Sequence, residues 1–464
     1  MRYLRTVAAA LVLAFLAANP APAASSKKVN CHKDLKKARE LINDRWSFKI
    51  FKPGAVDLDE AFKQLEPLAK RADTPEACAR VIARFMAKLG DGHSRLQYYP
   101  DLNYSAPLIV IRSLRERLSK VPGQRPKVHA YVFARDTTNE ELKTIPRGSE
   151  ILAVDGVETE SLYREMAQYV SGSTAQWKDY LCDRQLLLGP AETEIDLTYR
   201  EPGGARKTIA IVRPSVDSLK ETPEEVRAHL GWEDESSSQR LEGGWGYIKY
   251  TSFSWGNPKR SVEVFDEALD SIFDAPALII DLRGNGGGYV DAISKIAGRF
   301  IAARETMGFY SVRTPGQETI SRVWDEATGS VNSRPRLLAT PRKEIYTGPV
   351  VILIDRRCFS ACESFTGGVQ SFGRALVIGS DASGGGSGFV GGLKLPSGAI
   401  ISFSWTVAWL PNGQQIEGHG VAPDILVRER ARDWAVGRDR VLSRAIKALE
   451  QGEAKPLTAA ETGT

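Results

Sequence analysis

The chain is poor in the residues from which metal and redox sites are built. Its 464 residues include 5 cysteines and 5 histidines. No Cys-x-x-Cys or Cys/His spacing suggests a zinc site, so we expect no metal and no cofactor. Cys31 and Cys78 both lie near the N-terminus and could pair, while the odd count leaves at least one cysteine free.

Long apolar runs are missing after the first residues. A basic start with Arg2 and Arg5 precedes an apolar run over residues 7–18 and a Pro- and Ala-rich stretch over residues 19–24. This pattern predicts a secretory signal peptide over residues 1–24, because the run is too short to span a bilayer. An uncleaved anchor is the alternative, and the two prolines argue against it. No later segment reaches ~18 apolar residues, so we expect no integral membrane span after signal removal. The short signal favours the bacterial periplasm, with secretion beyond it as the alternative.

A strong excess of one charge is also missing. Lys and Arg number 62 against 57 Asp and Glu, which gives a net charge of +5, and the charges are interspersed. This argues against a nucleic-acid site. Hydrophobic residues make up 42%, as in globular proteins, and the length exceeds the roughly 250–300 residues of a single core. We therefore expect several domains. No oligomeric state is predicted.

The sequence predicts three successive segments between residues 25 and 240. Residues 25–105 carry apolar residues at helical spacing and predict an N-terminal helical region. Residues 106–215 favour strands, with a hairpin over 148–156 that resembles the hairpin of PDZ domains. The stretch 160–187 is longer than the helix of a plain PDZ domain. Residues 216–240 predict a polar linker with one short helix.

The last third predicts an α/β domain. Residues 277–282 and 349–355 are continuous apolar runs between amphipathic helices. Such runs indicate a parallel sheet covered on both faces. We assign this core to residues 241–451 and a disordered tail to residues 452–464.

Ser360 follows one of these buried strands. The strand ends at Asp355 and a helix is expected to begin near Ser360. A helix N-terminus offers free N–H groups and a dipole that favour negative charge, which suits a nucleophilic serine. The alternative is a serine that only caps the helix, which is the commoner role in general.

The other buried strand runs into a glycine-rich turn. Residues 283–288 read Arg-Gly-Asn-Gly-Gly-Gly, and successive glycines let backbone N–H groups approach a ligand. The N–H of Gly287, or of Gly286, could form an oxyanion hole with that of Ala361. The alternatives are a phosphate loop or a plain turn, but the Lys-Ser/Thr of a P-loop is absent.

His93 and Glu417 complete the candidate set. His93 lies in a tight turn between Gly92 and Ser94, where it could act as general base or simply end a helix. Glu417 could orient that histidine, or could be an ordinary surface carboxylate. His419 is a rival base.

These segments together resemble the C-terminal processing (tail-specific) serine peptidases. The matching motifs occur in the family's order along residues 75–450: Gly-Asp-Gly-His at 90–93, the PDZ-like unit, Asp-Leu-Arg-Gly-Asn-Gly-Gly-Gly at 281–288, Phe-Ser-Ala-Cys-Glu at 359–363, Phe-Gly-Arg-Ala-Leu-Val-Ile-Gly at 372–379 and Glu-Gly-His-Gly-Val-Ala-Pro-Asp at 417–424. The resemblance implies a crotonase-like α/β core, a helical N-terminal part, a PDZ-like domain, a protein or peptide substrate and cleavage without a metal.

One departure from the family bears on mechanism. Most members use a Ser-Lys dyad, but Gly385 stands where the lysine is expected. The tricorn-like branch lacks this lysine and uses histidine and glutamate, which this chain has as His93 and Glu417. The resemblance therefore implies a serine endopeptidase with a Ser360-His93-Glu417 triad and an acyl-enzyme.

Alternatives remain. The same scaffold could bind peptides or apolar ligands without cleaving them, and the crotonase-like core could serve an acyl-CoA enzyme, although export makes CoA scarce. Cys362 replaces the second serine of the family's Ser-Ala-Ser-Glu and is expected to be a packing residue rather than a thiol nucleophile. Cys358 and Cys362 could form a redox pair that flanks Ser360, but we give this alternative little weight, because cysteines at i and i+4 of a helix are poorly placed for a bridge.

Overall fold

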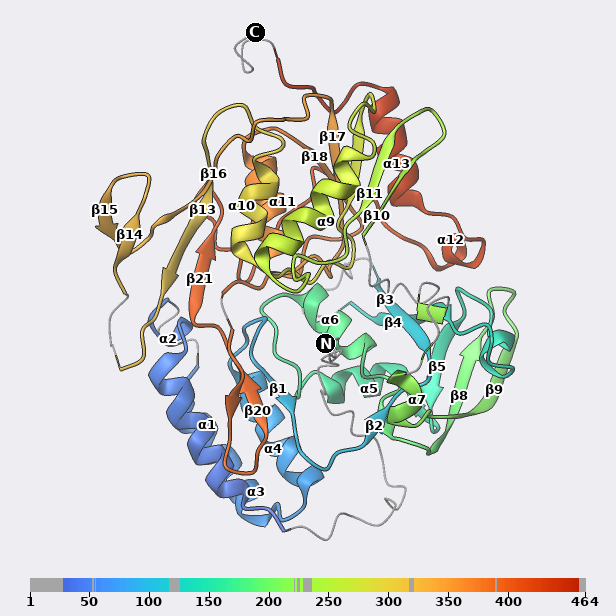
Figure 1. Ribbon diagram of the computed structural model, residues 1–464. Helices are drawn as coiled ribbons and strands as arrows, with labels where there is room; N and C mark the ends of the chain where they lie inside the picture. Colours follow the sequence, from blue (N-terminus) through green and yellow to red (C-terminus); the bar gives the residue numbers. More distant parts are fainter. Residues whose placement is uncertain are drawn as a thin grey trace.

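The structure is a computed structural model that describes residues 28–51, 54, 56–116, 126–220, 222, 226–227, 236–316, 321–388 and 390–458 (Figure 1). The predicted signal peptide, residues 1–24, lies outside the described residues. Within the described part of the chain, no helix is long and apolar enough to cross a membrane.

Four helices form the N-terminal region, drawn in blue in Figure 1. They are α1 (Cys31–Arg45), α2 (Phe48–Phe51), α3 (Leu58–Arg71) and α4 (Pro75–Lys88). Asn30, Asp57 and Thr74 cap the starts of α1, α3 and α4 through their side chains, as short polar residues do. The Cys31–Cys78 disulfide joins α1 to α4.

This region also contains strands, which the sequence prediction did not include. Strand β1 (Arg95–Tyr98) pairs with β20 (Ile400–Ser402), which in turn pairs with β19 (Leu393–Lys394). The helices and these strands share one core, in which Phe85 and Leu96 pack with Phe403. The C-terminal part of the chain thus returns to the N-terminal helices, close to the turn that carries His93.

The middle region is built on an antiparallel sheet. Its strands run in the order β3-β4-β5-β8-β9, and β6 pairs with β5. Their bounds are β3 (Ile109–Arg115), β4 (Val128–Arg135), β5 (Glu150–Val154), β6 (Val157–Glu158), β8 (Glu194–Arg200) and β9 (Arg206–Val212). The 160–187 stretch supplies α5 (Thr159–Met166) and α6 (Ala175–Asp183), and β2 (Tyr104–Ser105) pairs with β7 (Gly189–Pro190). The likeness of this region to a PDZ domain stays a prediction.

The C-terminal third contains the predicted parallel sheet. Its order is β10-β11-β12-β17-β18-β22, and every pair from β11 onward is parallel. The strands are β10 (Ser237–Arg240), β11 (Gly246–Lys249), β12 (Leu278–Asp281), β17 (Val350–Ile354), β18 (Leu376–Gly379) and β22 (Ile425–Leu426). All residues of β12 and β17 are buried, so their unbroken apolar sequence reflects cover on both faces. The predicted α/β fold is confirmed.

Helices cover the two faces of this sheet (Figure 1). On one face lie α9 (Pro258–Asp270), α10 (Val290–Ala297) and α11 (Ala361–Ser371), which pack on Ile280 and Ile352. On the other face α13 (Arg440–Glu450) packs on Ile279 and Val351. Because parallel strands end at one edge of the sheet, the turns after β12 and β17 lie side by side.

A smaller sheet in the order β16-β13-β21 lies beside α11. It contains β13 (Glu305–Val312), β16 (Arg336–Ala339) and β21 (Thr406–Trp409), and a hairpin of β14 (Val323–Asp325) and β15 (Ser330–Asn332) extends from it. Two short helices, α7 (Val216–Lys220) and α12 (Ala431–Ala435), lie before β10 and after β22 in the chain.

Two predicted boundaries need correction. Residues 237–240, placed in the linker, form strand β10 and pair with β11 because the core sheet extends one strand further. Residues 452–458, placed in a disordered tail, pack on the core: Ala454 is buried and the Leu457 N–H donates to Thr347 O at 2.8 Å. Residues 459–464 lie outside the described residues.

Candidate active site

Ser360 stands between the end of β17 and the start of α11. It is the N-cap residue of α11 and has φ 59° and ψ −121°, a region that residues with a side chain rarely occupy. Such a conformation costs free energy of about 1–3 kcal/mol and clusters at functional sites. The next N–H, that of Ala361, has no acceptor among the described residues. The turn therefore places a hydroxyl beside an unengaged backbone donor.

Glu363 holds this turn from inside the helix. Its carboxylate accepts hydrogen bonds from Ser360 N at 2.8 Å and from three donors of the 383–388 turn: Ser383 Oγ at 2.5 Å, Gly385 N at 2.7 Å and Gly386 N at 2.9 Å. Burial raises the pKa of Glu363 to about 7, although these hydrogen bonds act to lower it. Sequence reasoning gave this residue no role, although Ser-x-x-Glu is the signature of a capping box.

The glycine-rich turn after β12 lies directly against Ser360. A Cβ at Gly287 would stand 2.9 Å from the Ser360 Cβ and 2.5 Å from the Phe359 carbonyl oxygen, so only glycine fits. The Gly287 N–H donates to Asn285 Oδ1 at 2.9 Å, whereas the Gly286 N–H has no acceptor among the described residues. In this conformation Gly286 and Ala361 are the unengaged donors of the predicted oxyanion set.

His93 is buried against the residue that precedes Ser360. Its ring lies 4.7 Å from the Phe359 ring, centre to centre, and Phe359 stacks on Trp177 of α6 at 3.8 Å. Burial, with the charge of Arg95, lowers the pKa of His93 to about 3, so the imidazole is neutral. The His93 Nδ1 has no hydrogen-bond partner in the described part of the chain. A neutral ring with an unoccupied nitrogen can accept a proton.

Glu417 reaches the same turn through the backbone. It is fully buried, and its carboxylate accepts from Gly92 N at 2.8 Å and from Ser387 N at 3.0 Å. Burial, with the charge of Asp91, raises the pKa of Glu417 to about 8. Among the described residues no hydrogen bond joins the His93 ring to Glu417 or to Ser360. The structure therefore brings the three segments together without forming the hydrogen-bonded chain of a triad.

Asp91 shapes the His93 turn and was given no role from the sequence. One carboxylate oxygen accepts from His93 N at 2.8 Å and Ser94 N at 2.7 Å, and the other accepts from Trp46 Nε1 at 2.7 Å. An aspartate that accepts from the N–H groups two and three residues later forms a local turn, and Gly-Asp-Gly-His carried that signal. The rival base His419 is exposed.

The turn over residues 383–388 has no room for the family's lysine. Gly385 has φ 77°, and a Cβ there would stand 2.3 Å from the Thr174 Cγ2. Ser173 Oγ and Thr174 Oγ1 donate to the carbonyls of Gly385 and Gly384, each at 2.5 Å. The segment before α6 is thus docked on the turn where most members carry their base.

A cavity of about 70 Å³ opens beside Ser360 and Ala361. Its walls include Met307, Leu337 and Ala408, and none of the described residues that line it is charged. An apolar pocket next to a nucleophile is suited to hold an uncharged side chain. Within the described residues, no cluster of three or more His, Cys, Asp or Glu side chains could hold a metal ion.

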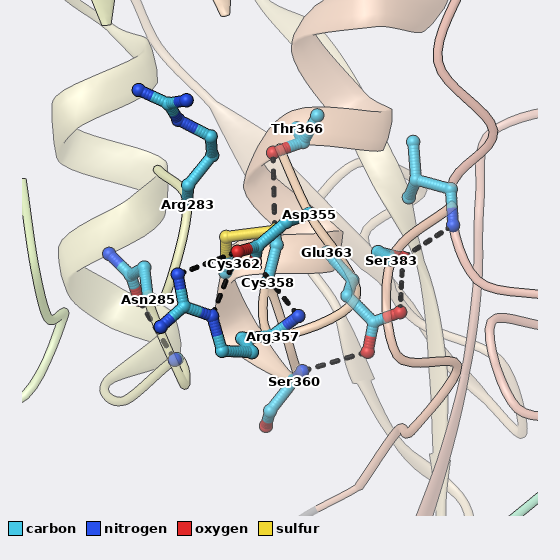
Figure 2. The surroundings of a disulfide bond; sticks show 12 residues. Arg283, Asn285, Asp355, Arg357, Cys358, Ser360, Cys362, Glu363, Thr366 and Ser383 are labelled. Carbon is cyan, nitrogen blue, oxygen red and sulfur yellow. Dashed lines mark hydrogen bonds and ion pairs between the residues drawn. A yellow bond between two sulfur atoms is a disulfide. The ribbon is translucent and has the colours of Figure 1, made fainter. Parts of the chain in front are cut away.

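One expectation near the nucleophile is wrong. Cys358 and Cys362 form a disulfide, with their Cα atoms 5.4 Å apart (Figure 2). The prediction treated them as i and i+4 of one helix, but α11 begins only at Ala361. Cys358 lies in the preceding turn, where the chain direction brings the two side chains together. Cys31 pairs with Cys78, as the sequence allowed, and Cys182 is free and buried.

Comparisons with known proteins show what this chain is similar to. Residues 244–427 match the model of peptidase family S41. Tricorn protease homolog 1 of Streptomyces coelicolor is 27% identical over 58% of this chain and 23% of its own length. The carboxyl-terminal-processing protease of a Picosynechococcus species is 24% identical over 64% of this chain and 60% of its own length. The chain therefore spans less than two thirds of either relative.

The fold agrees with a solved structure of low sequence identity. Mature CPAF in complex with lactacystin has a TM-score of 0.69 and 16% identity, and the match covers 91% of this chain and 98% of that one. The matched region contains the glycine-rich turn, the Ser360 turn and Glu417. Residues 244–427 are therefore similar to peptidase family S41, and the relatives of the chain include a carboxyl-terminal-processing protease.

Proposed function

We propose that the protein is an exported serine endopeptidase that uses Ser360, His93 and Glu417. The observation that carries the proposal is the Ser360 turn, in which a residue with φ 59° stands at a helix start beside the free Ala361 N–H. A plain capping serine needs no such conformation, because N-cap residues ordinarily adopt extended backbone angles. The conformation turns the hydroxyl away from Glu363, as Figure 2 shows.

The chemistry begins with proton transfer to His93. The ring is neutral in the resting structure, so it can take the Ser360 proton as the hydroxyl attacks the scissile carbonyl. Burial lowers the pKa of His93 to about 3 and opposes this transfer, so the charged ring needs a carboxylate to stabilise it. The ring turns toward Ser360 for this step, since it lies against Phe359 in the resting structure. The protonated imidazole then gives its proton to the leaving amine, and water hydrolyses the acyl-enzyme.

The negative charge that develops on the carbonyl oxygen needs fixed donors. The Ala361 N–H and the Gly286 N–H are unengaged, and the Gly287 N–H becomes available if it leaves Asn285 Oδ1. Glu417 positions the base by holding the Gly92 N–H, and its buried carboxylate stabilises a charged imidazole nearby.

Two observations support export. Four of the five cysteines are paired in disulfides, which persist in oxidising compartments such as the bacterial periplasm. The predicted signal peptide at the N-terminus is consistent with this. The substrate we propose is a protein or peptide that places an uncharged side chain in the cavity beside Ser360.

Covalent labelling with a fluorophosphonate probe tests the proposal. The Ser360 oxygen attacks phosphorus and fluoride leaves, so labelling reports an activated serine. We expect labelling of purified mature protein at Ser360, its loss in Ser360→Ala, and a decrease of at least 100-fold in His93→Ala. Ser371→Ala, at the far end of the same helix, is the matched control and keeps the wild-type rate. Mass mapping of the labelled peptide separates Ser360 from Ser364, which lines the same cavity.

The alternative is a protein that binds peptides on this scaffold without cleaving them. It predicts no labelling of any folded variant and no release of product from peptide libraries. Wild-type-like activity in a folded His93→Ala protein would instead overturn the assignment of the base.

A further inference from the structure

A disulfide joins the two cysteines that flank Ser360 in the sequence. Cys358 lies two residues before Ser360 and Cys362 two residues after it, and both are fully buried. Figure 2 shows the disulfide behind the turn, on the side of Thr366, with the Ser360 hydroxyl pointing away from it. The proposed function gives this bond no role.

The disulfide joins the segment before Ser360 to the segment after it, and the backbone conformation of Ser360 depends on both. The segment before Ser360 is held by hydrogen bonds from Phe359 N to Asn285 O and from Gly384 N to Cys358 O. The segment after it begins α11. A residue in a rarely populated backbone region keeps that conformation only when its surroundings hold it from both sides. The bond between Cys358 and Cys362 is a covalent tie directly across Ser360.

Breaking the bond must move the turn. Two thiol sulfurs that are not bonded stand much further apart than the ~2.0 Å of a disulfide. Both cysteines are fully buried in the core that contains Phe365 and Ile354, and close packing there resists that separation. The turn before Ser360 and the first turn of α11 therefore have to shift apart. The shift also reaches the base, because the ring of Phe359 contacts His93.

We propose that the Cys358–Cys362 disulfide is a redox switch on the nucleophile, active when oxidised and weakly active when reduced. The inference rests on the proposed function. Cys358 and Cys362 act here as positioning residues, since they hold the Ser360 turn and do not touch substrate. A chain that still has the two thiols before export would be a poor peptidase. Thiol–disulfide exchange with a disulfide oxidant after export would form the Cys358–Cys362 bond and switch the enzyme on, and the oxidant would leave as a dithiol with the two electrons and two protons.

The reductant is a dithiol. One of its thiolates attacks a sulfur of the disulfide and forms a mixed disulfide, and its second thiolate then displaces that sulfur. Two electrons and two protons pass to the protein, which gains two thiols, and the dithiol leaves as a cyclic disulfide. The hydroxyl of Thr366, 3.8 Å from the Cys358 sulfur, is a polar neighbour for the released thiol.

The test measures the labelling rate of Ser360 in both redox states. Wild type is compared with a Cys358→Ala/Cys362→Ser double variant and with a Cys31→Ala/Cys78→Ala double variant, which removes the remote disulfide and keeps the one at the nucleophile. Each protein is treated with excess dithiol, and alkylation followed by mass analysis reports which bond is reduced. Refolding without an oxidant supplies the reduced form if the buried bond resists. Circular dichroism confirms the fold.

We expect reduction to lower the labelling rate constant and kcat of wild type at least tenfold, with KM within twofold, and reoxidation to restore both. The Cys31→Ala/Cys78→Ala variant should respond in the same way, and the Cys358→Ala/Cys362→Ser variant should have one rate with and without dithiol. A labelling rate unchanged after proven reduction of the Cys358–Cys362 bond overturns the inference and leaves the proposed function standing. The inference is also overturned if the labelling rate falls with reduction of the Cys31–Cys78 bond and not with reduction of the Cys358–Cys362 bond. If even oxidised wild type is labelled no faster than Ser360→Ala, the proposed function is wrong and the inference falls with it.

Discussion

The carboxylate of Glu363 accepts the backbone N–H of Ser360 at 2.8 Å, so one buried charge fixes the residue proposed as nucleophile. Its other partners, Ser383 Oγ, Gly385 N and Gly386 N, also donate to it. A proton on this carboxyl would face a donor and break at least one of these bonds. The ionised form is therefore the one that matches the site, and burial places its pKa at about 7.

This relationship predicts a pH-dependent activity. The value of kcat/KM should rise with pH through about 7 to 8, where Glu363 and then Glu417 lose their protons. His93 contributes no such limb, because its pKa is about 3. In Glu363→Gln, the rise of kcat/KM near pH 7 should disappear and the rise near pH 8 should remain. The value of kcat should fall at least tenfold. A profile from pH 5 to 9 on both proteins decides it, and an unchanged midpoint in the variant would show that Glu363 is not the titrating group.

Glu417 makes a prediction about stability. The pKa of this carboxyl is about 8 in the fold, against an ordinary value of 4.5. Between these values the folded state binds a proton that the unfolded state has released, so the free energy of unfolding falls as pH rises through the window. Relative to Glu417→Gln, which does not titrate, wild type should lose stability from pH 5 to pH 8.5.

Denaturant unfolding of both proteins at several pH values measures this difference. Glu242→Gln, at an exposed position, is the control and should follow wild type at every pH. A constant gap between wild type and Glu417→Gln across the range would contradict the prediction.

The parallel sheet and the two turns at its edge could be predicted because their signals are local. An apolar strand, a glycine-rich or Ser-containing turn and a helix follow one another within about a dozen residues. The grouping of His93 with Ser360 and Glu417 came from the resemblance to a family, since no local pattern joins residues this far apart in the sequence. The structure supplies the physical link, a hydrogen bond from Gly92 N to Glu417.

Other features depend on packing that the sequence does not display. The Cys358–Cys362 bond was discounted because the helix was taken to include both residues. The helix begins only at Ala361, so Cys358 lies outside it and the bond can form. Strands β13 and β16 wall the cavity at Ser360, and the sequence analysis gave them no role. The stack of Trp177 on Phe359 joins elements 182 positions apart and has no sequence signature.

That stack predicts a link between the middle region and catalysis. Trp177→Ala removes the ring that packs on Phe359, and truncating a buried tryptophan costs about 3–5 kcal/mol. Because Phe359 also contacts His93, we expect kcat to fall at least tenfold beyond any loss of folded protein. Trp177→Phe retains an aromatic partner and should keep kcat within about threefold of wild type. Equal losses in the two variants, with equal melting temperatures, would argue against the link.

The cavity beside Ser360 makes a prediction about specificity. Met307, Leu337 and Ala408 give it apolar walls, so the residue before the cleaved bond should be apolar and uncharged. Leu337→Asp places a carboxylate on this wall. We expect kcat/KM for apolar residues at this position to fall at least tenfold, while peptides with lysine or arginine there become relatively better substrates.

Leu338→Asp is the matched control for this test, because Leu338 is the next residue of β16 and does not line the cavity. Side chains alternate between the two faces of a strand, so the same charge one residue along faces away from Ser360. Leu338→Asp should keep the wild-type preference even if it lowers the melting temperature. Profiling with a peptide library that varies only this position separates the two variants. If both change the preference in the same way, the cavity does not hold the side chain before the cleaved bond, and the substrate must enter the site from another direction.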